Sequence, residues 1–144
     1  RKKTILNEKF HLSFPYIFEY KKKLFMCPDT SEISEIRIYR CLKFPYKWVF
    51  HKTLKKNIRS VDSLIFKKNN LWWLFTNIDR SNTGDYNHDL SIFYSKNGPL
   101  SQNWKSHPLN PIEIDSSKSR NAGLIFKNNT LNTKYDFYGF LNTM

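Results

Sequence analysis

Hydrophobic residues along the chain gather in short runs, and segments rich in lysine and asparagine separate these runs. Three stretches, at 13–29, 61–77 and 121–131, share one order: a short head, an apolar run that contains Ile-Phe, and a turn of Lys and Asn. A second apolar run follows the turn in the first two stretches. Asparagine tolerates positive φ better than most residues, which suits the pairs at 69–70 and 128–129 to tight turns. The pattern therefore predicts a β-hairpin in each stretch.

A third apolar run follows each of the first two hairpins, at 35–41 and 89–95, and a Pro and then a Trp come after it. The whole unit recurs at intervals of roughly 50 to 60 residues, which is typical of four-stranded propeller blades. We therefore predict an all-β chain that forms about two and a half four-stranded blades of an incomplete β-propeller. The predicted blades are 11–58 and 59–112, and a third blade begins in 113–144.

The run Leu71–Phe75 is apolar at every position, so it lacks the alternation of a strand that has one face in water. A helix is excluded because the run is short and asparagine-rich turns bound it. Each blade of a propeller packs against neighbours on both faces, which makes its central strands apolar on both faces. We therefore predict that Trp72 and Trp73 are core residues that point into two different layers between blades.

The formal net charge of the chain is +12, and clustered positive charge is typical of nucleic-acid binding. The lysines instead stand where apolar strands pause, as in Lys21-Lys22-Lys23 and Lys67-Lys68, which is typical of solvated turns. Lysine also outnumbers arginine, the residue that forms bidentate contacts with phosphates and bases. We therefore expect no nucleic-acid partner.

Several other kinds of segment and site are not indicated by the sequence. No stretch approaches about 18 uninterrupted apolar residues, so we expect no membrane span, and we expect a cytoplasmic location. The first residues hold neither an apolar signal core nor an initiating Met, so we expect a fragment of a longer protein. Cys27 and Cys41 are predicted to be free thiols, although a disulfide between them stays open. The spacing of His and Cys predicts no metal site, and we expect no cofactor because no glycine-rich phosphate loop is present.

The residues that head the innermost strands of a propeller converge on one pocket at the central axis. The positions four residues before the Ile-Phe phenylalanines are Phe14, Asp62 and Ala122, and only Asp62 is ionisable. Asp62 is therefore our candidate catalytic residue, as a general base. Glycoside hydrolysis needs two carboxylates, and the equivalent positions supply no second one. The alternative for Asp62 is a carboxylate that caps its own turn through backbone amides.

Three further side chains are candidates for binding a substrate in the same pocket. Asp29 follows the second strand of the first unit, at a rim where a carboxylate is also a common turn-former. Arg120 precedes the third hairpin, and it suits either bidentate binding of a carboxylate or phosphate or a salt bridge between blades. His11 precedes the first hairpin and is expected either in the pocket or on the surface.

Several segments between about residue 11 and residue 131 together resemble one known family in their order and spacing. They are HLSFPYIFEY, LFMCPDTSE, IRIYRCLKFPYKW, VDSLIF, WWLFTN, IFYS, HPLNPI and RNAGLIF. The family is the N-terminal propeller domain of glucosamine inositolphosphorylceramide transferases and their bacterial relatives, which is similar to the five-bladed furanosidase-type propellers of glycoside hydrolases. The resemblance implies a five-bladed β-propeller, incomplete in this chain, and a carbohydrate-related role. The chain departs from the family at Asp29, where Glu is more usual, at Asn121, where Pro is usual, and after Leu131.

The resemblance also implies that the sugar-transfer chemistry of such proteins lies in a separate C-terminal domain. We therefore expect a domain that binds sugar at its central pocket and belongs to a protein that builds a glycan or glycolipid. The residues expected to line the sugar site are Asp62, His11, Asp29 and Arg120. The expected partners are a carbohydrate, nucleotide-sugar or glycolipid substrate and an additional domain on the same full-length chain. The alternatives are a glycoside hydrolase and a non-catalytic glycan-binding module.

Overall fold

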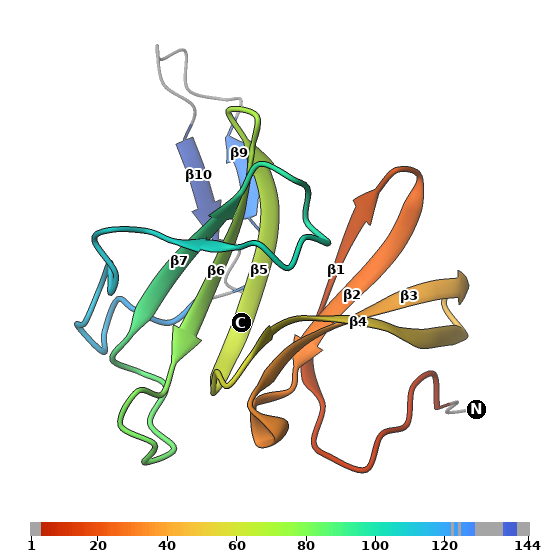
Figure 1. Cartoon of the computed structure of the whole chain (residues 1–144), viewed down its shortest axis with the longest axis horizontal. Coiled ribbons are helices and arrows are strands. Elements are labelled where there is room, and N and C mark those ends of the chain that lie inside the picture. Colours follow the sequence, from red (N-terminus) through yellow and green to blue (C-terminus); the bar gives the residue numbers. More distant parts are fainter. Residues whose placement is uncertain (1–3, 122, 124, 129–136, 141–144) are drawn as a thin grey trace.

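The computed structural model describes residues 4–121, 123, 125–128 and 137–140. Over these residues the chain is all-β, with one turn of 3-10 helix at Ser31–Ile33. The strands form two four-stranded antiparallel sheets and one two-stranded hairpin (Figure 1). The all-β class predicted from the sequence is therefore confirmed, and so are the two four-stranded units.

The two sheets repeat the same order of strands, each strand antiparallel to the next in the chain. The first sheet consists of β1 (Ser13–Tyr20), β2 (Lys23–Asp29), β3 (Glu35–Lys43) and β4 (Lys47–Lys56). The second sheet consists of β5 (Ser60–Lys68), β6 (Leu71–Ile78), β7 (Leu90–Ser95) and β8 (Lys105–Ser106). The first sheet lies within the predicted unit 11–58, and the second lies within 59–112.

A third hairpin follows the second sheet in the chain. It pairs β9 (Ile125–Asn128) with β10 (Phe137–Phe140) in antiparallel register. The sequence after Leu131 departs from the repeated pattern, but the structure places a second strand there all the same. The tight turn predicted at 128–129 includes residues outside those described.

The turns of the first two hairpins explain how each sheet begins. Lys21 and Lys22 have φ of 50° and 59°, and Asn69 and Asn70 have φ of 51° and 60°. Two-residue hairpin turns with positive φ at both positions match the right-handed twist of the flanking strands. The predicted turn at 69–70 is confirmed, whereas the lysine pair adopts the same backbone without the tolerance that asparagine has for it.

The two sheets pack face to face through β5, which lies against β1 and β2 of the first sheet (Figure 1). One buried apolar cluster fills this layer and draws side chains from both sheets. Its members include Phe18, Phe25, Ile38, Ile65, Leu74, Phe93 and Trp104. Phe25 and Cys27 on β2, and Ile36 and Ile38 on β3, are two positions apart, so each pair points to the one face of the first sheet that supplies the shared core.

The two adjacent tryptophans lie on opposite faces of β6. Trp72 packs against the shared core, and its ring meets Tyr20 of β1 edge-on at 5.5 Å between centroids. Trp73 contacts Tyr94 of the neighbouring strand β7, with 6.0 Å between the ring centroids. Both side chains are half-buried. The two side chains face opposite sides of the sheet, as the prediction requires, but among the described residues only Trp72 packs into a layer between two sheets. The prediction that both are core residues was too strong.

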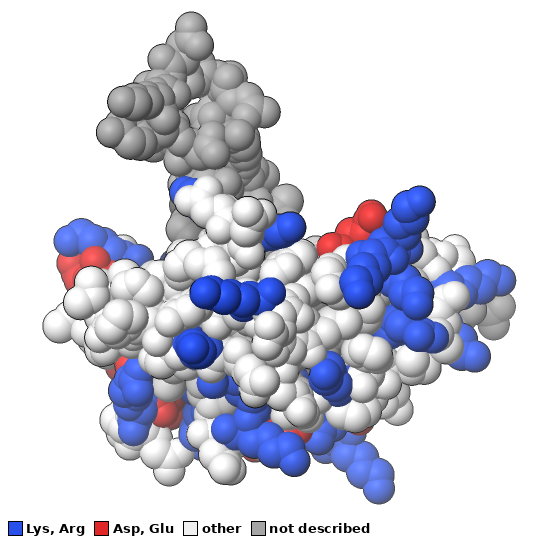
Figure 2. Space-filling view, turned by 45° about the horizontal axis from the view of Figure 1, so that its top comes forward, with Lys and Arg blue, Asp and Glu red and all other residues white. Residues whose placement is uncertain are grey.

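Three features bear on the kinds of partner and site that were considered from the sequence: the distribution of charge, the two cysteines and the helical content. Figure 2 shows Lys and Arg in separate groups over one face of the molecule, with uncharged surface between them. Cys27 and Cys41 are both free thiols, and Cys27 is buried. Among the described residues, no helix is long and apolar enough to cross a membrane.

Candidate functional site

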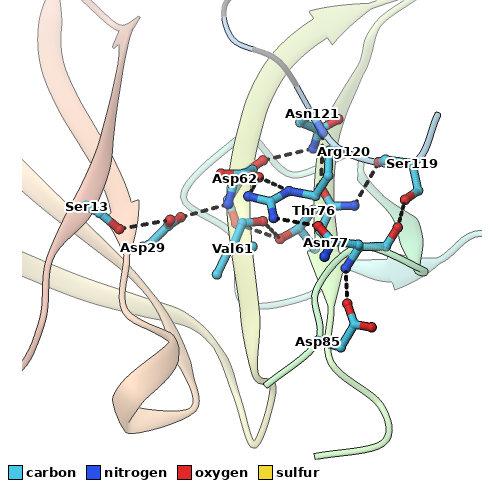
Figure 3. Close-up of polar contacts among 12 residues, drawn as sticks. Ser13, Asp29, Val61, Asp62, Thr76, Asn77, Asp85, Ser119, Arg120 and Asn121 are labelled. Atoms are coloured by element: carbon cyan, nitrogen blue, oxygen red, sulfur yellow. Dashed lines mark hydrogen bonds and ion pairs between the residues drawn. The ribbon is translucent and has the colours of Figure 1, made fainter. Parts of the chain in front are cut away.

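The end of β2 and the start of β5 are joined by a hydrogen bond between two of the predicted site residues. The backbone N–H of Asp62 donates to Oδ1 of Asp29 at 2.8 Å. The other oxygen of Asp29 accepts the Ser13 hydroxyl at 3.2 Å. Both carboxylates are buried, with 7% of Asp29 and 5% of Asp62 exposed. One carboxylate of the first sheet therefore holds the first strand of the second (Figure 3).

A β-bulge makes this backbone N–H available. The pairing register of β5 shifts between Val61 and Leu64, and Asp62 has φ of 53° within the shift. The register of β1 shifts at the equivalent place, where Phe14 has φ of 44°. A bulged residue leaves the ladder of hydrogen bonds, so its N–H is free for another partner. The predicted equivalence of Phe14 and Asp62 thus has a structural basis.

Arg120 supplies the positive charge of the cluster. Its Nε and Nη2 lie 2.6 Å and 2.5 Å from Oδ2 of Asp62, and its Nη1 donates to Oδ1 of Asn87 at 3.0 Å. The Arg120 side chain is 45% exposed, whereas that of Asp62 is 8% exposed. Solvent therefore reaches the ion pair from the side of the arginine. This contact is the interaction between units that we weighed for Arg120 as an alternative to substrate binding.

Asn77 repeats the role of Asp29 one unit further along the chain. It stands at the end of β6, as Asp29 stands at the end of β2. Its Oδ1 accepts the backbone N–H of Asn121 at 3.1 Å, and its Nδ2 donates to the carbonyl of Ser119 at 2.7 Å. The second sheet thus holds the chain that enters the third hairpin in the way that the first sheet holds the second.

Asn121 closes the cluster and leaves one buried acceptor without a partner. Its Nδ2 donates to the backbone carbonyl of Asp62 at 2.8 Å. Its Oδ1 is buried and has no hydrogen-bond partner among the described residues. A buried polar atom without a partner costs free energy, so such an atom at a site is a candidate contact for a ligand.

The two carboxylates differ in their electrostatic surroundings, although burial raises the pKa of both. Burial raises the pKa of Asp29 to about 7, because the hydrogen bonds from Asp62 and Ser13 offset only part of the desolvation and the nearby Asp62 charge adds to it. Burial also raises the pKa of Asp62, but the adjacent Arg120 guanidinium opposes this shift. Asp29 therefore exchanges a proton near neutral pH, while Asp62 has a cation beside it.

The structure brings together three of the four predicted site residues: Asp29, Asp62 and Arg120. His11 is not among them. Its side chain is exposed, and its backbone N–H donates to Glu32 at 2.7 Å. The sequence alone did not single out Asn77 and Asn121 as members of the cluster. The signal was the position of Asn77, which corresponds to that of Asp29 in the repeat.

A hollow of about 270 Å³ lies beside the first strand. Its lining runs from Phe14 to Ile17 on β1 and includes Gly123, two residues beyond Asn121. Both parts of this lining adjoin members of the cluster in sequence, since Phe14 follows Ser13. No group of His, Cys, Asp and Glu among the described residues is arranged to hold a metal ion. The arrangement suits a polar, uncharged ligand with several hydroxyl groups, because the carboxylates accept hydrogen bonds, the guanidinium donates them and the amides do both.

Comparison with known proteins gives one consistent family. A family model described as "Glucosamine inositolphosphorylceramide transferase 1, N-terminal" matches residues 3–135 of the chain. The protein named glucosamine inositolphosphorylceramide transferase 1 is 38% identical over 124 residues in Oryza sativa subsp. japonica and 37% identical over 124 residues in Arabidopsis thaliana. Each alignment covers 84% of this chain but 16% of the relative's length. No solved structure matches the chain.

Proposed function

We propose, because the chain belongs to the family of glucosamine inositolphosphorylceramide transferase N-terminal domains, that it is a sugar-binding part of a longer protein that builds a glycolipid. The relatives are named as transferases, and the chain spans only 16% of their length. Sugar transfer itself is therefore assigned to another domain of the full-length protein. The substrate of that protein is a nucleotide-sugar, a glycolipid or both.

The observation that carries this proposal is the cluster of Asp29, Asp62 and Arg120. A sugar presents hydroxyl groups that both donate and accept, and hydrogen bonds to ionised groups are about twice as strong as neutral ones. Asp62 and Arg120 provide one acceptor and one donor at an edge that solvent reaches. The unpartnered Oδ1 of Asn121 adds a second acceptor beside them.

We also propose that the two sheets are neighbouring blades of a five-bladed β-propeller. The proposal is supported by the repeated link between units, from Asp29 to Asp62 and from Asn77 to Asn121. A similar link from each unit to the next stacks each new unit on the one before, which is how radial repeats build a ring. In that ring the bulges of β1 and β5 face the central axis.

Glycoside hydrolysis is a second candidate, and one observation favours it. Asp29 and Asp62 form a pair of buried carboxylates, and the pKa of Asp29 is raised by burial to about 7. Hydrolysis of a glycosidic bond needs one protonated and one ionised carboxyl group on either side of the bond. In this interpretation Asp29 is the acid and Asp62 is the base or nucleophile.

The two candidates are separated by one set of measurements on the purified protein. Calorimetric titration with myo-inositol, glucosamine and a panel of furanoses tests binding, and release of chromophore from aryl furanosides tests hydrolysis. Asp62→Asn is expected to weaken sugar binding about tenfold, because a charged acceptor becomes neutral. Glu19→Gln, an exposed carboxylate on β1, is the matched control and is expected to bind as the parent does.

Binding without chromophore release supports the binding domain, and release that is lost in Asp62→Asn supports the hydrolase. If neither sugar binding nor release is detected, the proposed function is wrong. Thermal unfolding of Asp62→Asn is recorded in parallel, so that a loss of binding in a folded variant is told apart from a loss of fold.

A further inference from the structure

A second and larger hollow, of about 760 Å³, opens between the two sheets at the end where the Asp29–Asp62 cluster lies. Four parts of the chain line it: Ser34 before β3, the end of β4 with the linker to β5, the end of β6 with the residues after it, and Phe93 of β7. The charged and aromatic residues of its lining are Lys55, Lys56, Arg59, Asp79, Arg80 and Phe93. Four cations and one carboxylate therefore surround one space.

Both arginines of this hollow are already balanced by carboxylates. Arg59 lies 3.2 Å from Oδ2 of Asp79, and Arg80 forms an ion pair with Asp89. Asp79 has little capacity left, because it also accepts the backbone N–H groups of Thr83 and Gly84. The positive charge of the hollow beyond these pairs comes from the two lysines.

Lys55 is the cation of this hollow that is partly buried and has no counter-ion among the described residues. Its Nζ lies 4.2 Å from the centroid of the Phe93 ring, and the side chain is half-buried. Burial lowers its pKa, and no ion pair to Lys55 occurs in the described part of the chain. Lys56 is exposed. It lies opposite Glu35 in the register of β3 and β4, and the Glu35 carboxylate forms an ion pair with Arg37. A partly desolvated ammonium without a counter-ion is stabilised by any anion that enters the hollow.

We infer that this hollow binds the phosphate of a phosphorylated sugar whose sugar ring lies at the Asp62 cluster. The inference rests on the proposed function, because it adds a phosphate to the sugar proposed above. Two lysines beyond the balanced arginines match the one or two negative charges of a phosphate. The phosphate of a nucleotide-sugar and that of an inositol phospholipid headgroup share this chemistry.

The spacing of the two sites along the chain fits one ligand. Arg59 borders the hollow and Asp62 belongs to the cluster, three residues later, which corresponds to about 10 Å of extended chain. The same holds at the end of β6, where Asp79 borders the hollow and Asn77, two positions earlier, belongs to the cluster. A sugar phosphate has about this length, so one molecule reaches both sites.

The test is calorimetric titration of the purified protein with inorganic phosphate, myo-inositol, myo-inositol 1-phosphate and UDP-glucose. We expect phosphate to bind alone and each phosphorylated sugar to bind more tightly than phosphate. Lys55→Met keeps an apolar side chain over Phe93 and removes the charge, and it is expected to weaken phosphate binding at least about tenfold. Lys67→Met, at the exposed opposite end of β5, makes the same change in net charge and is expected to leave binding unchanged.

Each outcome bears on one proposal. Equal phosphate binding by the Lys55 variant and the parent, or an equal loss in both lysine variants, overturns the phosphate site. A phosphorylated sugar that binds no more tightly than phosphate overturns the single ligand. If myo-inositol and other neutral polyols bind but phosphate does not, the proposed function stands and the phosphate site is rejected. If phosphate binds but the neutral polyols do not, the proposed sugar site is rejected and the phosphate site stands. Tighter binding of UDP-glucose indicates a nucleotide-sugar, and tighter binding of the inositol phosphate indicates a lipid headgroup.

Discussion

Oδ1 of Asp29 accepts the backbone N–H of Asp62 at 2.8 Å, so the last residue of β2 fixes a bulged residue in the first strand of the next sheet. Asn77, near the end of β6, makes a similar hydrogen bond at 3.1 Å to the backbone N–H of Asn121, which precedes the third hairpin. Hydrogen bonds of this kind therefore join the first sheet to the second and the second sheet to the chain that follows it. They also explain why the candidate site lies at a junction rather than inside one sheet.

The pH dependence of stability tests the burial of Asp29. Its pKa is raised by burial to about 7, whereas an aspartate in an unfolded chain titrates near about 4. Between these values the folded state binds a proton that the unfolded state lacks, so this contribution to stability is lost as pH rises from about 4 to about 7. Asp29→Asn is expected to remove this slope and to exceed the parent in stability above pH 7 by up to a few kcal/mol.

Free energies of unfolding in urea, measured between about pH 4 and pH 8, check this expectation. Glu19→Gln is the control, because Glu19 is an exposed carboxylate on the same sheet. Parallel pH profiles for Asp29→Asn and the parent protein would show that Asp29 is not perturbed.

Removal of the Arg120 side chain tests the ion pair that joins the third segment to the second sheet. Arg120→Ala leaves the buried Asp62 carboxylate without its cation, and we expect a loss of about 1–3 kcal/mol in unfolding free energy. The exposure of Arg120 keeps the loss below that of a fully buried pair. Lys118→Ala breaks the exposed pair with Asp115 and is expected to change stability by less than about 0.5 kcal/mol. Equal effects of the two substitutions would reject a special role for the Arg120 contact.

The contact between Trp72 and Tyr20 joins the two sheets, so removal of the Trp72 side chain is expected to lower the unfolding free energy. Trp72→Ala removes an edge-on ring contact and part of the shared core, and we expect a loss of about 2–4 kcal/mol. Phe44→Ala serves as the control, because this side chain is 60% exposed and its loss is expected to cost less than about 1 kcal/mol. Thermal unfolding of both variants distinguishes a side chain between the sheets from one on the surface.

The lysine pair in the first hairpin turn predicts a stabilising substitution. Lys22 has φ of 59°, a conformation that costs a residue other than glycine or asparagine about 1 kcal/mol. Lys22→Gly is therefore expected to stabilise the protein by a few tenths of a kcal/mol to about 1 kcal/mol. Asn70→Gly, at the matching position of the second turn, is expected to gain less because asparagine already tolerates φ of 60°. A larger gain from Asn70→Gly in chemical unfolding would contradict this explanation.

The pattern of apolar and turn residues was sufficient to predict the hairpins, the order of strands and the two four-stranded sheets. Strand pairing follows from which residues alternate and where positive φ is tolerated, and both properties are local. The same pattern overestimated the burial of Trp72 and Trp73, because the depth of a side chain depends on the layer that covers it. The strand β10 was also missed, since its residues pair with β9 without repeating the earlier apolar run.

Of the candidate site, the sequence by itself determined which residues stand at the ends of equivalent strands, and so it singled out Asp62, Asp29 and Arg120. Only the tertiary structure decided that these three meet, that His11 stays apart, and that Asn77 and Asn121 complete the cluster. The physical reason is that these contacts join residues far apart in the chain, such as Asp62 and Arg120, which are separated by 58 positions. Their geometry depends on bulges and on the packing of one sheet against another, and neither is encoded by the residues within any single strand.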